Sequence, residues 1–87
     1  MGIAKEIYEI DGFMSGSKYV LTINEDESVQ LDYYEGTTRI TECNPQIVPC
    51  GNNGGKRLEF GTSTVKSSFP FKNYNDGKLD SKWTQIL

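Results

Sequence analysis

The two cysteines of this chain, Cys43 and Cys50, are the side chains whose type and spacing could support covalent or metal chemistry. Two thiolates supply half of a zinc site, which needs two more ligands, and the chain contains no histidine. The Cys-x-x-Cys spacing of thiol redox enzymes is absent. A disulfide across the six intervening residues would stabilise the fold by about 2–3 kcal/mol in the chain-entropy model. We predict this disulfide, no metal and no cofactor; the alternative is two reduced, buried cysteines at the ends of neighbouring strands.

The segment between the cysteines predicts a binding surface. Two prolines restrict its backbone, and a glycine- and asparagine-rich run, residues 51–55, follows Cys50 as apparent slack. Residues 43–56 therefore read as one shaped loop, and a pre-ordered loop lowers the entropy cost of binding. In the alternative interpretation, Ile47 and Val48 are buried and the segment only connects two strands. The residues predicted to bind a protein partner are Asn44, Pro45, Gln46, Ile47, Val48 and Pro49.

The aromatic residues suggest a second kind of site. Most of the ten Phe, Tyr and Trp side chains are expected in the core of so short a chain. The candidates for an aromatic platform or a barrel mouth that binds a sugar or another small ligand are Tyr34, Tyr74 and Trp83.

A catalytic constellation is not recognisable. Without histidine, acid–base work would fall to carboxylates, tyrosine or cysteine, and no serine or cysteine stands beside a recognisable base. Gly54-Gly55-Lys56 is not a phosphate-binding loop, because Arg57 follows where serine or threonine is needed. We predict that the chain is not an enzyme.

Charge and hydropathy limit the partners and the compartment. The net charge is −3 with the twelve acidic residues spread along the chain, which argues against nucleic acid or an anionic membrane as partner. No apolar run approaches the roughly 18 residues of a membrane span. The N-terminal segment lacks a signal-peptide core. The predicted disulfide and the Ser-, Thr- and Asn-rich composition favour a mature secreted or periplasmic domain, with a cytoplasmic location as the alternative.

The composition and the alternating hydrophobicity predict an all-β fold. Alanine, the best helix former, occurs once. Residues 19–23, 29–33 and 37–43 predict a three-stranded meander, and residues 3–10 fit a strand somewhat better than a short helix. We expect a single domain, residues 1–87, built as a small antiparallel sandwich or open barrel of six to seven short strands.

Three functions remain from the sequence. The preferred one is a binding module that recognises another protein, as an inhibitor, immunity or effector-type protein does, through residues 43–56 and the adjacent turns. The second is a small-molecule or carbohydrate binder. The third is a structural subunit that pairs with a partner through an edge strand.

Overall fold

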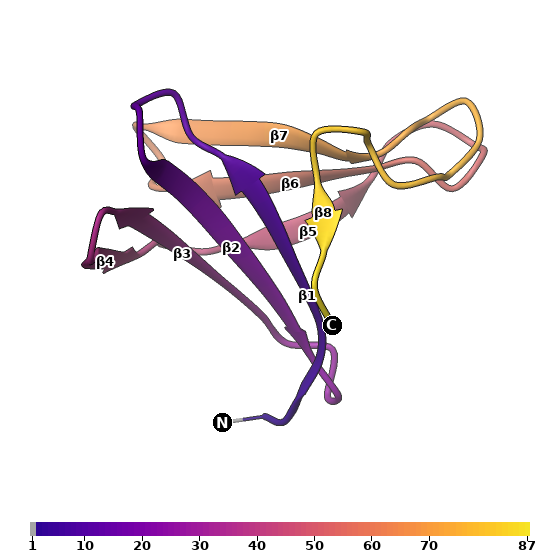
Figure 1. The fold of residues 1–87 in the computed structure, drawn as a ribbon. Helices are drawn as coiled ribbons and strands as arrows, with labels where there is room; N and C mark the ends of the chain where they lie inside the picture. The colour runs from indigo at the N-terminus through magenta and orange to yellow at the C-terminus, as the bar shows by residue number, and fades with distance from the viewer. Residues whose placement is uncertain (1) are drawn as a thin grey trace. The chain divides into compact units, whose positions relative to one another are not determined.

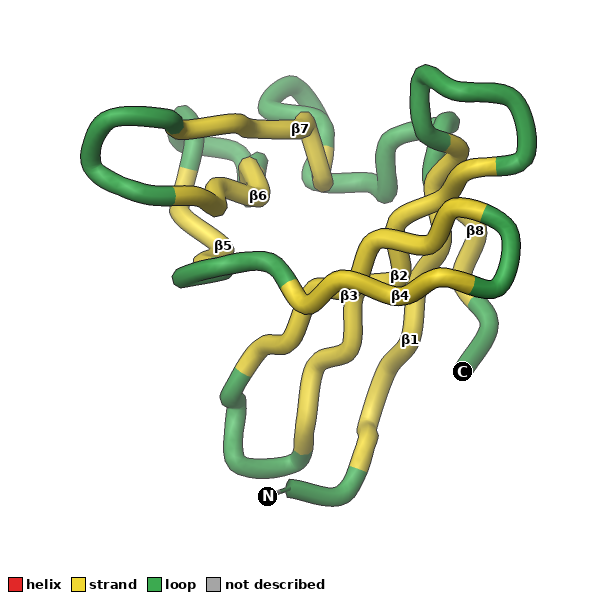
Figure 2. The backbone as a smooth tube through the Cα atoms, turned by 90° about the vertical axis from the view of Figure 1, so that its left-hand side faces the viewer, coloured by secondary structure: helices red, strands yellow, loops and turns green. Residues whose placement is uncertain are grey.

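The computed structural model describes residues 2–87, and these residues form strands and loops without any helix (Figures 1 and 2). The strands build two antiparallel sheets, ordered β4-β3-β2-β1-β8 and β5-β6-β7. The all-β prediction is confirmed, with eight strands rather than six or seven. Their bounds are β1 (Ala4–Asp11), β2 (Ser17–Asn24), β3 (Val29–Glu35), β4 (Thr38–Thr41), β5 (Gln46–Pro49), β6 (Lys56–Gly61), β7 (Lys66–Lys72) and β8 (Thr84–Gln85).

The chain divides into two compact units, each of which contains one sheet. The first comprises residues up to Glu42 together with Lys82–Leu87, and the second comprises Cys43–Ser81. The single domain stays a prediction. In residues 2–87, no helix has the length and apolar character of a membrane span.

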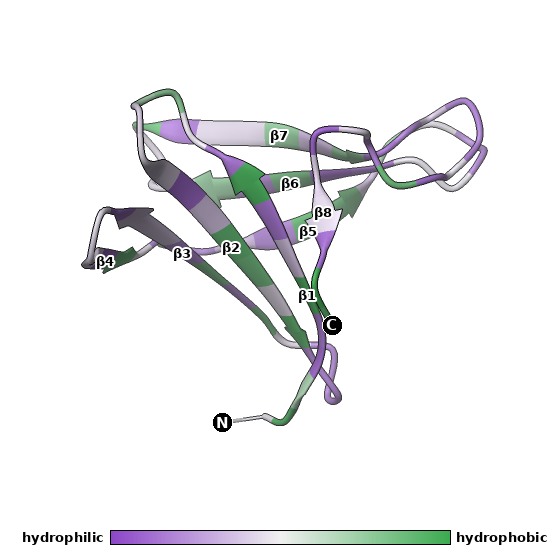
Figure 3. Cartoon of the chain, in the orientation of Figure 1, coloured by the Kyte–Doolittle hydropathy of each residue, from purple (hydrophilic) through white to green (hydrophobic). Residues whose placement is uncertain are grey.

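The first strand settles the choice between helix and strand at the N-terminus. Ile7 and Ile10 fit one face of a helix, but β1 pairs with β2 along its length, so successive side chains alternate between the two sheet faces. Tyr8 and Ile10 are buried on one face, while Ile7 lies on the other. Figure 3 shows hydrophobic and hydrophilic residues mixed along β1. The strand prediction for residues 3–10 is confirmed.

The buried side chains of the larger sheet form cross-strand rows. Leu21 stands opposite both Tyr8 and Leu31, and all three are buried. In the next row on the same face, the Tyr19 and Tyr33 rings approach to 4.9 Å between centroids. Burying side chains of this kind stabilises a fold by about 1.5–3 kcal/mol each. The meander predicted for residues 19–43 therefore forms because its apolar face is continuous across strands.

Burial also changes the acid–base behaviour of Tyr8. The loss of solvent, with a smaller contribution from the Glu6 carboxylate that accepts its hydroxyl hydrogen bond, raises the Tyr8 pKa from 10.0 to about 12. The unfolded chain therefore releases this proton near pH 10 while the folded chain keeps it to about pH 12. Between these values the free energy of unfolding should fall with rising pH, by about 2–3 kcal/mol more than in a Tyr8→Phe variant. Urea titrations of both proteins at pH 9, 10 and 11 follow the first half of this fall, about 1.4 kcal/mol, and parallel pH profiles would contradict the assignment.

The smaller sheet has β6 at its centre. Leu58 and Phe60 alternate along β6 and are buried on the same sheet face, and the Phe69 ring on β7 stacks 5.8 Å from Phe60. Pro70 lies within β7, which is an edge strand, as its lack of an N–H predicts. Residues 62–65 form the turn between β6 and β7, in which Thr62 N–H donates to the Val65 carbonyl at 2.9 Å.

Candidate functional site

The segment between the cysteines is a strand rather than a loop. Residues 46–49 form β5, which pairs with β6 and leaves its other edge without a neighbouring strand. The loop prediction is wrong because proline is compatible with an edge strand wherever its missing N–H would point away from the neighbouring strand.

The prolines of β5 occupy such positions. Bonded and non-bonded pairs alternate in an antiparallel ladder, and Cys50 N–H donates to the Gly55 carbonyl at 2.8 Å. Bonded positions recur every second residue, so the backbone N–H and C=O groups of Val48, two residues before Cys50, point towards β6. Those of Pro45, Ile47 and Pro49 point away from β6. The outward edge thus has Ile47 as its only N–H donor among these three residues.

The predicted disulfide is not formed, and both cysteines are free thiols. The Cys43 carbonyl accepts from Gly61 N–H at one end of β6, whereas Cys50 bonds to Gly55 at the other end. A six-residue strand at about 3.4 Å per residue separates its ends by about 17 Å. A disulfide requires Cα atoms within about 7 Å, so the extended β5 keeps the thiols apart. The predicted export now rests on composition alone.

The glycine-rich run after Cys50 is exposed over residues 51–54, but it is held at Gly55 by close packing against a second turn. Gly55 is buried, and a Cβ atom built there would lie 2.4 Å from both the Cys50 carbonyl oxygen and the Tyr74 Cα. A Cβ on Gly77 would lie 2.8 Å from the Asn53 carbonyl oxygen. The glycines therefore let residues 51–55 and the turn at 73–77 approach backbone to backbone, which fixes Tyr74 beside Cys50.

These turns border a surface depression at the Lys56 end of β6. It has a cavity volume of about 310 Å³ and is lined by Cys50, Lys56, Arg57, Pro70, Lys72 and turn residues 73–76. We call it the cationic depression, because three of the chain's nine basic residues line it against one acidic residue, Asp76. Asp76 uses one carboxylate oxygen to accept from Lys78 N–H at 2.9 Å.

The outer face of the small sheet adjoins this depression. Val48, Arg57 and Pro70 stand opposite one another across the three strands, on the face opposite Leu58. The Arg57 guanidinium donates to Ser68 Oγ at 2.7 Å on the same face. The face formed by these side chains is called the outer face, and it comprises Gln46, Val48, Arg57, Glu59, Ser68 and Pro70.

The structure divides the residues predicted to bind a protein. Val48 belongs to the outer face, whereas Ile47 stands opposite buried Leu58 on the other face. Both are half-buried. Asn44 and Gln46 line a different depression of about 240 Å³ at the opposite end of β6. Pro45 and Pro49 hold the edge of β5. The six residues therefore do not share one face of the small sheet.

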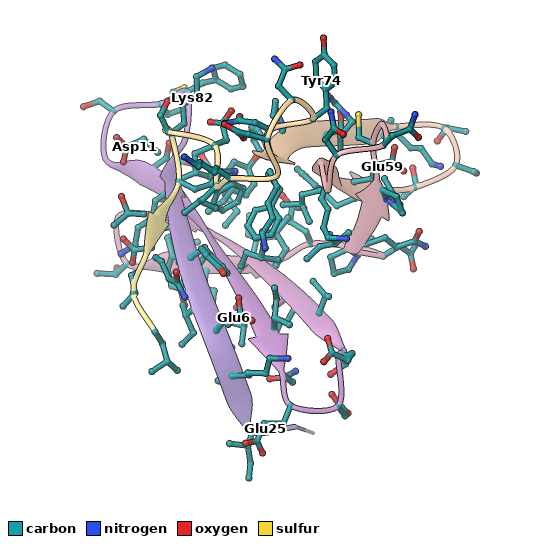
Figure 4. The ribbon with its side chains drawn as sticks, turned by 90° about the vertical axis from the view of Figure 1, so that its right-hand side faces the viewer. Glu6, Asp11, Glu25, Glu59, Tyr74 and Lys82 are labelled. Atoms are coloured by element: carbon teal, nitrogen blue, oxygen red, sulfur yellow. The ribbon has the colours of Figure 1, made fainter. Side chains whose placement is uncertain are left out.

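The three aromatic residues predicted to bind a small ligand are not brought together. Trp83 is 4% exposed and cannot offer its ring to a ligand from this position. Tyr34 is half-buried on β3, with the Lys18 ammonium 5.8 Å from its ring centroid, and β2 and β1 separate β3 from β8. Tyr74, in the other unit, is 61% exposed and points outward from its turn (Figure 4).

The sequence interpretation missed the basic residues of the depression. Lys56, Arg57 and Lys72 are dispersed along the chain, and only the pairing of β6 with β7 brings them together. A partial signal exists in Lys56-Arg57, the only pair of adjacent basic residues in the chain. Within residues 2–87, no group of three or more His, Cys, Asp or Glu side chains is arranged to hold a metal ion. No family model, curated protein or solved structure matches the chain.

Proposed function

We propose that this chain is a non-catalytic protein-binding module whose partner docks on the outer face beside the cationic depression. One observation carries the proposal: the Val48, Arg57 and Pro70 row leads directly into a depression bordered by exposed Tyr74. Arginine, tyrosine and apolar groups gathered around a concave surface are typical of interface hot spots. The inhibitor, immunity and effector classes all fit such a module.

The rigidity of this surface supports the same proposal. Pro70 and the paired strands fix the backbone, and the contact between the two turns places Tyr74. The Ser68 hydroxyl holds the Arg57 guanidinium. A surface ordered before binding loses less conformational entropy when its partner docks.

A Val48→Asp variant should lose capture of the native partner from an extract of the source organism. Aspartate would replace an apolar contact at the centre of the docked face with a carboxylate that engages Arg57, which stands opposite, so affinity should fall at least about tenfold, equivalent to about 1.4 kcal/mol. Quantitative pull-down against wild type measures this loss. The matched control is Val65→Asp, because Val65 is 70% exposed in the turn at the far end of the same sheet.

A second variant separates binding from folding. Tyr74→Ala removes an exposed ring and should also weaken capture while leaving the thermal unfolding curve nearly unchanged. Equal capture by wild type, Val48→Asp and Tyr74→Ala would refute the proposed surface.

The edge-strand subunit stays a second candidate. It is supported by β4, an edge strand of four exposed residues without proline. Elution of the purified wild-type chain as a concentration-dependent dimer that Val48→Asp leaves unchanged would favour this candidate.

A further inference from the structure

We propose that the cationic depression binds an anionic side chain of a peptide segment in the protein partner. This inference rests on the proposed function, because it names the chemistry of the partner at the same surface. Lys56, Arg57 and Lys72 carry the argument.

The positions of Lys56 and Lys72 lower the stability of the fold. Lys56 on β6 stands directly opposite Lys72 on β7 in the antiparallel register. Like charges directly opposite one another in a sheet are destabilising. Neither lysine takes part in an ion pair within residues 2–87, whereas Lys5 pairs with Glu27 and Lys18 with Glu9. The chain carries twelve Asp and Glu side chains, any of which could have served as an ion-pair partner for one of these lysines.

The third basic residue is oriented for recognition. The Arg57 guanidinium donates to Ser68 Oγ at 2.7 Å, which leaves further N–H donors of the planar group for a ligand. Arginine binds carboxylate or phosphate oxygens through two parallel hydrogen bonds, whereas lysine acts as a point charge. One arginine and two lysines that line the same depression therefore suit a compact oxyanion.

The size of the depression and the overall charge indicate which ligand carries that oxyanion. A volume of about 310 Å³ lies at the lower limit of ligand pockets, so it accommodates one or two side chains. Pro70 and Tyr74 add apolar contacts suited to a peptide. Nucleic acids and anionic membranes require a longer basic surface, and the net charge of −3 would repel them.

Cys50 provides a built-in reporter, because its free thiol lines the depression. In a Cys43→Ser background, this thiol is the only one in the chain. Its reaction with the dianionic disulfide 5,5′-dithiobis(2-nitrobenzoate) is compared with its reaction with neutral 2,2′-dithiodipyridine. In each case the Cys50 thiolate forms a mixed disulfide and releases one aryl thiolate, which is measured by absorbance. The ratio of the two rate constants reports anion accumulation and cancels changes in thiol exposure.

Replacing Lys56 or Lys72 with glutamine should lower that ratio by about two- to threefold each at low ionic strength, and by about five- to tenfold together. In the protein that keeps both lysines, added salt should reduce the ratio of rate constants towards the value measured for the double variant. Each substitution should also raise the thermal midpoint, because it removes the like-charge pair. A gain in stability with a loss of anion selectivity is not expected from lysines that serve only the structure.

The control is Lys66→Gln, which removes the same charge from the opposite end of β7 and should leave the ratio unchanged. A hexaglutamate peptide should slow the reaction of Cys50 with the aryl disulfides. Inorganic phosphate at the same total charge concentration should not slow it. Protection by phosphate alone would overturn the peptide assignment. A ratio insensitive to both lysines would overturn the anion site itself, and it would do so independently of the Val48→Asp capture experiment.

Discussion

A Trp83→Ala variant should lose about 3–5 kcal/mol of unfolding free energy, the cost of deleting a large buried aromatic side chain. Trp83 is 4% exposed, so its replacement leaves a cavity that the surrounding side chains fill only in part. A domain of this length has a total stability of about 4–13 kcal/mol, and the variant should therefore be marginally folded at 25 °C. This result would assign the only tryptophan to the fold and remove it from the candidate ligand contacts.

Urea unfolding followed by far-ultraviolet circular dichroism measures this loss, since the variant has no indole fluorescence. Tyr74→Ala is the control, because Tyr74 is 61% exposed and its removal should change stability by about 0.5 kcal/mol or less. Similar losses from the two variants would mean that the burial assigned to Trp83 is incorrect.

Adding a single methyl group at Gly55 should cost about 3 kcal/mol, because the alanine Cβ would collide with the backbone of two segments. Neither the Cys50 carbonyl nor the Tyr74 Cα can rotate away as a side chain would. The turn at 73–77 must then move, so a Gly55→Ala variant should also bind the proposed protein partner more weakly than wild type.

Gly16→Ala is the matched substitution for comparison. Its φ of +76° makes alanine unfavourable by about 1 kcal/mol, but no atom lies within 4 Å of the added Cβ. Thermal and urea unfolding of both variants gives the difference. A smaller loss at Gly55 than at Gly16 would show that the contact between the two turns is looser than described.

Local patterns predicted the larger sheet well. The alternation around Leu21 and Leu31 and the short turn at Gly36 specify β2, β3 and β4 within one or two residues. These signals are local because each depends on neighbouring residues in the chain. The C-terminal residues carry weaker local signals and form only the two-residue strand β8 and a single bridge between Lys72 and Leu79.

The candidate site could not be read in the same way. Its basic residues gather only through the register of β6 with β7, which no short segment encodes. The prolines near Cys50 were interpreted as loop formers, although proline is also compatible with the edge strand of a sheet. The glycines at 51–55 indicated flexibility because the chain segment that fills the space beside them, around Tyr74, is about twenty residues away in sequence.

The placement of the prolines also limits how many copies of this chain can join through their backbones. Pro45 and Pro49 interrupt the donors of one edge of the small sheet, and Pro70 interrupts the other. In the larger sheet β8 has two residues, which leaves β4 as the longest proline-free edge. Fibre growth by strand addition needs two competent edges on every molecule. A molecule with one such edge has a valence of one, so its self-pairing ends at two copies and open-ended polymers are avoided.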